Sequence, residues 1–267
     1  MKKIDLNEDV VKKLYLEGNS AYTIAKFFKC SEGAIQRVIR KLGIMRNHSE
    51  ACRKRTNKPT GIKDESFFES IDTEEKAYWL GFLMADGCVN IKANRVQLAL
   101  AETEPIEKFK KSIKSNQKIK TYTRKDGHIS YRFDITSKKM CDDLIKHGCV
   151  PKKTYILKFP NIKKELIHHL IRGYFDGDGS IFFNKPKGNY IKPTISIVGN
   201  EDFLKGLKEN LNMREYNMSL RIRHPERNNN IRFFTLDGKT ACKKFFEIIY
   251  KDATIYLERK YLKFTTI

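Results

Sequence analysis

The sequence predicts an α+β protein with two pseudo-symmetric αββαββα halves, whose antiparallel sheets form a saddle, and a small three-helix module before them. Three observations predict this fold. Residues 8–43 contain three short helical patterns, a helix-like motif ending in Asp-Gly occurs twice, and each copy is followed by the same order of hairpins and helices. We therefore expect four segments: a helix-turn-helix-like module (1–45), a basic linker (46–66), a first half (67–158) and a second half (159–267).

The N-terminal module has its apolar residues on one face of each helical pattern. Ser20 and Ser31 stand where the N-caps of the second and third helices are expected, and Gly18 and Gly43 can end the first and the third. The short connection before the third helix resembles that of a helix-turn-helix, whose last helix enters the major groove of DNA. The alternative is an ordinary three-helix cap. The residues expected to contact DNA from this helix are Gln36, Arg37 and Arg40.

The charge of the chain points to a large anionic partner. Lys and Arg number 53 against 32 Asp and Glu, which gives a formal net charge of +21. The basic residues are spread along the whole length, which favours a phosphate backbone over a small acidic metabolite. The basic linker is either merely solvated, or it tracks phosphates or the minor groove and tethers the two modules, and the sequence leaves both open.

Membrane insertion and secretion are both disfavoured. No apolar run reaches the roughly 18 residues of a bilayer span, and polar sequence follows the first residues where a signal peptide would be apolar. The six cysteines form no CxxC pair, which is typical of reduced residues. We therefore expect a cytoplasmic location in a bacterial or phage context, or an organellar one, and no membrane partner.

The repeated motif is the most informative feature of the chain. Ala77-Tyr-Trp-Leu-Gly-Phe-Leu-Met-Ala-Asp86-Gly87 recurs as His169-Leu-Ile-Arg-Gly-Tyr-Phe-Asp-Gly-Asp178-Gly179. Small residues lie four apart in both copies, so the two helices can approach closely and dock the halves. We expect the two terminal glycines to adopt left-handed turns that end the helices. The small-residue pairs are Gly81 with Ala85 and Gly173 with Gly177.

The docked helices would deliver Asp86 and Asp178 to the same end of their contact. Two carboxylates at helix C-termini repel each other and the negative end of the helix dipole, so a hard divalent cation is expected to compensate them. We expect Mg²⁺, with Mn²⁺ or Ca²⁺ as substitutes, bound by the two aspartates with Gly87 and Gly179 as the adjacent helix-end positions. Phosphodiester oxygens and water would complete the coordination, which favours metal-assisted phosphodiester hydrolysis.

The two motifs resemble those of LAGLIDADG homing endonucleases in their single-chain, two-motif form, over roughly residues 67 to 265. The resemblance implies a monomeric, metal-dependent, site-specific endonuclease that cuts double-stranded DNA at a long asymmetric target. It also implies one basic residue per half near the metals, and Lys153 and Lys260 match that place, so Asp86, Asp178, Lys153 and Lys260 form the expected catalytic set. An RNA maturase, with intron RNA as its partner, or a non-cleaving DNA-binding regulator on the same scaffold is the alternative.

The sheets are expected to carry base recognition, because alternate strand residues point away from the core and polar side chains on such a face pair with base edges. In the first half the expected outward residues are Asn90, Lys92, Arg95, Gln97, Lys118, Lys120, Tyr122, Arg124, Ser130, Arg132 and Asp134. In the second half they are Phe182, Asn184, Tyr190, Lys192, Thr194, Ser196, Arg221, Arg223 and Arg232. Because the two sets differ, a single chain is expected to read an asymmetric site.

Overall fold

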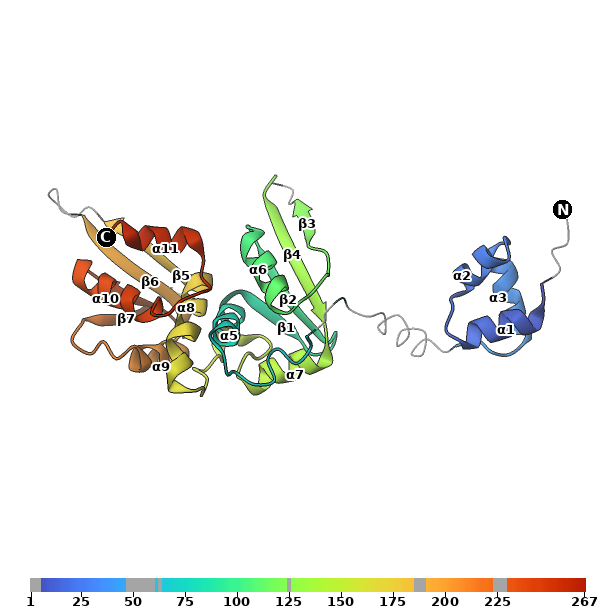
Figure 1. The fold of residues 1–267 in the computed structure, drawn as a ribbon, viewed down its shortest axis with the longest axis horizontal. Coiled ribbons are helices and arrows are strands. Elements are labelled where there is room, and N and C mark those ends of the chain that lie inside the picture. Colours follow the sequence, from blue (N-terminus) through green and yellow to red (C-terminus); the bar gives the residue numbers. More distant parts are fainter. Residues whose placement is uncertain (1–5, 47–60, 62–63, 124–125, 185–190, 223–229) are drawn as a thin grey trace. The chain divides into compact units, whose positions relative to one another are not determined.

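The computed structural model describes residues 6–46, 61, 64–123, 126–184, 191–222 and 230–267 (Figure 1). The chain forms two compact units, Met1–Pro59 and Thr60–Ile267, and each has its own apolar core. Within the described ranges, every helix is too short or too polar to cross a bilayer. Most of the expected linker and three expected DNA contacts, Arg124, Tyr190 and Arg223, lie outside the described residues.

The first unit contains α1 (Glu8–Leu16), α2 (Ala21–Phe27) and α3 (Glu32–Lys41), as the sequence predicts. The Oγ atoms of Ser20 and Ser31 each accept the backbone N–H three residues later, so both serines are the expected N-caps. Gly18 and Gly43 have positive φ just after α1 and α3. Val11, Ile24, Ala25, Ile35 and Ile39 form the core between the helices.

The second unit contains the two predicted αββαββα halves. The first comprises α5 (Glu74–Asp86), β1 (Gly87–Asn90), β2 (Arg95–Leu100), α6 (Glu104–Ser112), β3 (Lys120–Thr123), β4 (Ile129–Thr136) and α7 (Lys138–Lys146). The second comprises α8 (Ile167–Asp178), β5 (Gly179–Asn184), β6 (Lys192–Asn200), α9 (Glu201–Leu211), β7 (Met218–Ile222), β8 (Ile231–Asp237) and α10 (Lys239–Ile249), followed by α11 (Glu258–Thr265). The strand orders, β1-β2-β4-β3 and β5-β6-β8-β7, are the same, which confirms the predicted pseudo-symmetry.

Helices α5 and α8 lie side by side between the two sheets, and their backbones touch (Figure 1). A Cβ atom added at Gly81 would lie 2.1 Å from the carbonyl oxygen of Leu170, and one added at Gly173 would lie 1.9 Å from that of Tyr78. Any larger residue at either position would force the helices apart. The predicted close docking of the two halves is therefore confirmed.

The glycines after the two motifs have a different role from the predicted one. Gly87 has φ −76° and Gly179 has φ −89°, so both are extended, and the expected left-handed turns are wrong. Each glycine is the first residue of a strand that starts directly against the last turn of its helix. An added Cβ would lie 2.6 Å from the Leu83 oxygen at Gly87 and 2.5 Å from the Phe175 oxygen at Gly179. Glycine is required at both positions because the last turn of the helix leaves no room for a Cβ atom, and not because of the backbone φ angle.

Candidate functional site

The helix pair brings Asp86 and Asp178 together at one end of the contact. The Asp86 Oδ2 atom lies 3.2 Å from the position that a Cβ of Gly177, the residue before Asp178, would occupy. Both aspartates also act on the hydroxyl of Tyr174: burial is the main cause that raises the pKa of this tyrosine, and the two carboxylate charges raise it further. The two motifs therefore contribute to one site, as their spacing predicts.

The electrostatics at this site suit a bound cation. Burial raises the pKa of the Asp86 carboxyl, although the charges of Lys260, Lys153 and Arg259 act in the opposite direction. Across the described ranges, no group of three or more His, Cys, Asp or Glu side chains is arranged so that it could hold a metal ion by itself. The chain therefore offers two carboxylates as oxygen donors for a hard cation such as Mg²⁺, which usually keeps several waters and takes further oxygens from a phosphate substrate.

Lys153 and Lys260 lie at equivalent places behind the two aspartates. The Lys153 Nζ donates to the carbonyl oxygen of Gly87, and the Lys260 Nζ donates to that of Gly179 at 2.6 Å. Lys260 also donates to the carbonyl oxygens of Phe175 and Asp176, each at 2.6 Å. The two lysines therefore interact with the negative ends of α5 and α8.

The two lysines differ in burial. The Lys260 side chain is almost fully buried, with 4% of the residue exposed, whereas Lys153 is half-buried. Burial lowers the pKa of Lys260 to about 8, with the nearby Asp176 carboxylate as the main opposing charge. The two halves of the site are therefore similar in geometry and unequal in environment.

The structure adds Arg259 and Glu102 to the site, which sequence reasoning missed. The Arg259 Nε donates to the Glu102 Oε2 at 3.1 Å, and this ion pair joins the two halves. Both residues line a small pocket together with Asp86. No sequence signal marks the pair, since its members are 157 positions apart and belong to no repeated motif.

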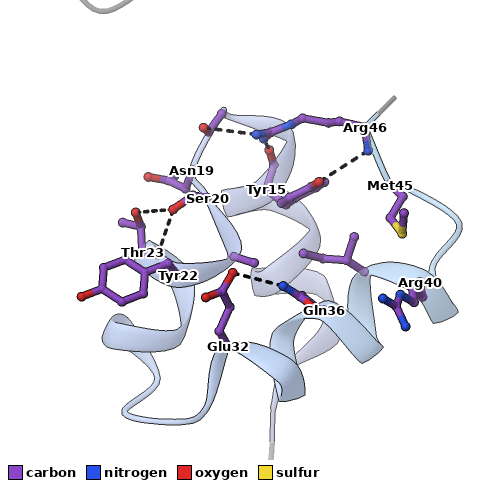
Figure 2. Close-up of a pocket in the computed structure, with 13 residues that line it drawn as sticks. Tyr15, Asn19, Ser20, Tyr22, Thr23, Glu32, Gln36, Arg40, Met45 and Arg46 are labelled. Atoms are coloured by element: carbon purple, nitrogen blue, oxygen red, sulfur yellow. Dashed lines mark hydrogen bonds between the residues drawn. The ribbon is translucent and has the colours of Figure 1, made fainter. Parts of the chain in front are cut away.

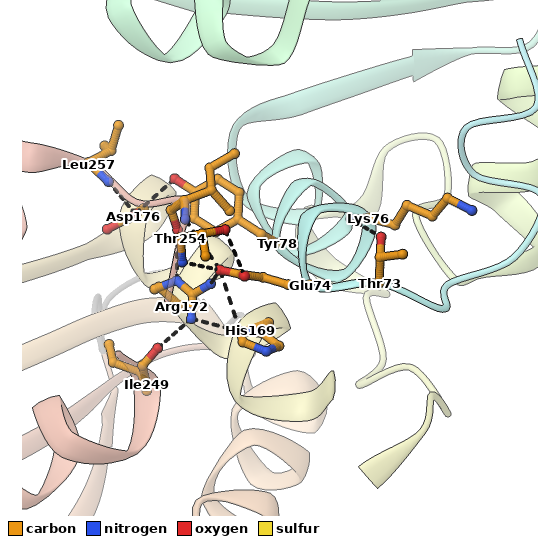
Figure 3. A network of polar contacts seen from close by, with 11 residues as sticks. Thr73, Glu74, Lys76, Tyr78, His169, Arg172, Asp176, Ile249, Thr254 and Leu257 are labelled. Atoms are coloured by element: carbon orange, nitrogen blue, oxygen red, sulfur yellow. Dashed lines mark hydrogen bonds and ion pairs between the residues drawn. The ribbon is translucent and has the colours of Figure 1, made fainter. Parts of the chain in front are cut away.

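A buried ionic network ties the starts of α5 and α8 to the segment 249–257 (Figure 3). Arg172 is fully buried, and its Nη2 donates to the Glu74 Oε1 at 2.6 Å. Its Nη1 and Nε donate to the carbonyl oxygens of Ile249 and Ile255, at 2.7 and 2.9 Å. Glu74 also accepts the backbone N–H of Thr254 at 2.7 Å. Glu74 of the first half therefore binds the C-terminal segment of the second half, both directly and through Arg172.

Asp176 extends this network toward Lys260. Its Oδ2 accepts the Tyr78 hydroxyl and the Leu257 N–H, both at 2.8 Å (Figure 3). Burial raises the pKa of Asp176 to about 6, against the favourable charge of Lys260 and these hydrogen bonds. The corresponding position in the first motif is Met84, so this acid belongs to the second half alone.

Comparison with known proteins identifies the architecture. Residues 73–146 match the family described as LAGLIDADG-like domain. The chain has a LAGLIDADG fold. Its structure is similar to that of the homing endonuclease I-WcaI bound to its DNA recognition sequence, with a TM-score of 0.50, 13% identity and coverage of 84% of this chain and 96% of that one. The LAGLIDADG homing endonuclease I-GzeII, in complex with a DNA target, gives a TM-score of 0.50, 11% identity and coverage of 71% of this chain and 87% of that one.

A curated sequence relative carries no established activity. An uncharacterized protein of Methanocaldococcus jannaschii is 27% identical over an alignment of 234 positions, and the match covers 70% of this chain and 86% of the relative. The match extends over most of both chains. It supports common descent of the larger part of the sequence and gives no function by itself.

The first sheet of the LAGLIDADG fold presents most of its expected polar residues on the face away from the core. The register places Asn90 with Arg95, Gln97 with Asp134, and Lys120 with Arg132, on the strand positions that alternate with the buried Val96, Leu98 and Phe133. Tyr122 pairs with Ser130 on the same face. Lys92 lies in the turn after β1, and Lys118 precedes β3, so these two are outside the strands.

Asp134 is less accessible than its outward position predicts. It is only 8% exposed, because the Arg132 Nε donates to its Oδ1 at 2.8 Å and the Lys120 Nζ lies 3.3 Å from its Oδ2. The carboxylate is thus engaged by two cations from its own sheet. Its geometry favours a role in fixing Arg132 and Lys120.

The second sheet corrects one expected direction. Arg232 pairs with Gly199 and Ile222 and lies two residues before the buried Phe234, so it belongs to the core side of β8. Its Nη2 lies 2.7 Å from the Glu201 Oε2. The expected outward orientation of Arg232 is therefore wrong. Phe233 and Phe234 are adjacent, so the sequence pattern alone does not show which of the two points into the core, and this choice also fixes the side of Arg232.

The strand register places the other described residues of the second set on the outward face, as expected. They are Phe182, Asn184, Lys192, Thr194, Ser196 and Arg221. Thr194 and Ser196 are only 4% and 7% exposed, because they lie on the central strand β6, which is flanked by β5 and β8. Sequence reasoning missed further residues of this face, which the register identifies as Ser180, Val198, Ser219, Phe233, Thr235 and Asp237.

In the first unit, Gln36 and Arg40 line a hollow beside the start of α2 (Figure 2). The Gln36 Nε2 donates to the Glu32 Oε1 at 3.1 Å. The hollow is bordered by Arg46, whose guanidinium lies 4.0 Å from the centre of the Tyr15 ring. Arg37, the third expected DNA contact of α3, is exposed. The polar residues that line the hollow, which do not include Arg37, give the three-helix unit a polar, concave face.

Proposed function

We propose that the protein is a site-specific endonuclease that hydrolyses double-stranded DNA with Mg²⁺. The main observation behind this proposal is that Asp86 and Asp178 lie close together at adjoining helix ends. Lys153 and Lys260 are hydrogen-bonded to the carbonyl groups of the glycines that follow the two aspartates. The DNA-bound LAGLIDADG structures named above support the choice of DNA as the substrate. The net charge of +21 supports a polyanionic partner in the same way.

In the proposed mechanism the two sheets hold the duplex and place a phosphodiester over the ends of α5 and α8. The carboxylates of Asp86 and Asp178 would hold the divalent ion, which when bound polarises the phosphoryl group and lowers the pKa of water. The lysines would offset the negative charge that builds up on the phosphate. Because Lys153 is half-buried and Lys260 is engaged by four carbonyl oxygens, Lys153 is the better placed of the two to reach a phosphate.

We further propose that the chain acts as a monomer, since one chain supplies both motifs, and that α3 of the first unit adds contacts to the same DNA. If the protein were only a maturase that binds intron RNA, or a regulator that binds DNA without cutting, the carboxylates of Asp86 and Asp178 would have no function. A protein with both activities stays compatible with the proposal.

The decisive experiment is a cleavage selection on a random-sequence duplex library, with Mg²⁺ and with EDTA. We expect cleavage of a discrete sequence with Mg²⁺ only, and loss of cleavage with retained binding in Asp86→Asn and Asp178→Asn. Asp142→Asn is the matched control, because this carboxylate is exposed on α7 and pairs with Lys138 away from the site. Undiminished cleavage by both site variants would exclude the proposed centre, and binding without any cleavage would favour the regulator.

A further inference from the structure

The outward faces of the two sheets are built from different chemistry. Gly87 and Gly179 are equivalent, so the strand positions that follow them define matching rows across each sheet. In the first sheet, the row that starts at Cys88 continues through Gln97 and Asp134. The next row contains Ala99, Arg132 and Lys120. Charged and amide groups therefore dominate this face.

The same rows in the second sheet carry hydroxyl and apolar groups. The first row has a hydroxyl on every strand, in the order Ser180, Ser196, Thr235 and Ser219. Ser219 and Thr235 are hydrogen-bonded to each other, with 2.5 Å between their oxygens. The next row contains Val198, Phe233 and Arg221, and Phe182 lies on the opposite side of the hydroxyl row.

Apolar side chains of this face reach solvent beside the exposed polar residues Ser180 and Arg221. Phe182 is 41% exposed, whereas Thr194, its partner across β5 and β6, is buried. Phe233 and Val198 are half-buried and directly opposite each other. The exposed Phe182 and the half-buried pair of Phe233 and Val198 lie on either side of the hydroxyl row, and together they form a surface that favours contact with an apolar group.

In the major groove of DNA, the apolar group available is the C5-methyl of thymine, whereas guanine and adenine offer acceptor and donor edges that suit Arg and Gln. We propose that the second sheet reads thymine methyl groups through Phe182, Val198 and Phe233, while the first sheet reads purine edges through Gln97 and Arg132. Asp134 fixes the Arg132 guanidinium, so that this side chain is preorganised for a planar base edge. This inference rests on the proposed binding of double-stranded DNA and adds the chemical identity of its two half-sites.

The test begins with the full-length protein and a random-sequence duplex library, selected for binding in the absence of divalent metal. Arg132→Ala and Phe233→Ser then assign the halves of the selected sequence, since each variant should relax base preference in one half only. The assigned second half-site is next synthesised with deoxyuridine in place of thymidine, which removes only the methyl group. We expect about fourfold weaker binding for each contacted methyl, the change that corresponds to about 0.8 kcal/mol.

The variants separate methyl recognition from general loss of binding. Phe233→Ser should bind thymidine and deoxyuridine duplexes equally at the affected position, and Arg132→Ala should keep the full difference. Val198→Thr, which is similar in shape, provides a second variant if Phe233→Ser unfolds, as judged by thermal denaturation. Equal binding of both duplexes by the unmodified protein would overturn the inference. Failure to enrich any sequence would instead overturn the proposed function.

Discussion

The Lys260 ammonium lies 2.6 Å from the carbonyl oxygen of Gly179, directly behind the aspartate that ends α8. Lys153 makes the same contact with Gly87 behind α5. Each helix thus has a cation where its dipole is negative and where its last carbonyl groups lack partners within the helix. The lysines that the family resemblance marks as catalytic therefore also stabilise the scaffold of the site.

We predict that Lys260→Met destabilises the protein much more than Lys153→Met. The first change leaves several buried carbonyl oxygens without their charged donor, and a buried hydrogen bond to a charged group contributes about 1.5–3 kcal/mol. Lys153 is more exposed, so water can replace it. Urea denaturation of both variants measures the difference, and equal midpoints would show that the burial of Lys260 has no energetic consequence.

We predict that Gly81→Ala and Gly173→Ala prevent correct docking of the two halves. The added methyl group would overlap a backbone carbonyl of the facing helix, which cannot move without separating α5 from α8. The cost should exceed the roughly 1–3 kcal/mol of ordinary overpacking. Gly33→Ala is the matched control: Gly33 is an exposed residue of α3 with nothing within 4 Å of an added Cβ atom, so the change should be neutral or stabilising. Thermal unfolding compares them, and near-normal stability of Gly173→Ala would contradict the close helix contact.

We predict an acid sensitivity that originates at His169. Burial, together with the Arg172 charge, lowers the pKa of His169 to about 4, against about 6.5 in the unfolded chain. The unfolded chain therefore takes up a proton first as pH falls, so stability should decline from about pH 6.5 to about pH 4, by about 3 kcal/mol in total. His169→Gln keeps a hydrogen-bond acceptor for Arg172 and does not titrate. Urea denaturation over this pH range should show a shallower decline in the variant, and parallel curves would refute the assignment.

We predict that deletion of residues 1–59 leaves a folded protein with weaker DNA binding. The second unit has its own core, so circular dichroism and thermal unfolding should show a cooperative fold. Loss of the basic first unit should flatten the dependence of log K on log salt by ~0.9 for each phosphate contact removed. Unchanged affinity and salt slope would show that the three-helix unit binds no DNA, and failure to fold would show that it is structural.

The repeat made the architecture predictable from the sequence, because the same apolar and small residues had to appear twice for two halves to dock. The α5–α8 contact follows directly from Gly81 and Gly173. The side of the sheet on which Arg232 lies could not be predicted in this way. Two adjacent phenylalanines do not show which residues of β8 face the core, and only the pairing of β8 with β6 determines it. The Arg259–Glu102 pair was equally invisible, because contacts between distant segments leave no local pattern.

The hold of Glu74 on the segment 249–257 has a consequence for building hybrid proteins from this chain. If the second half were transplanted alone, Arg172 would lose the Glu74 carboxylate of the first half, and an unpaired buried guanidinium is strongly destabilising. Exchanging the second half therefore requires a glutamate at the start of the recipient's first motif helix and a compatible segment before the terminal helix. The two halves resemble interchangeable modules in topology, yet this one cross-connection makes each of them specific for its present partner.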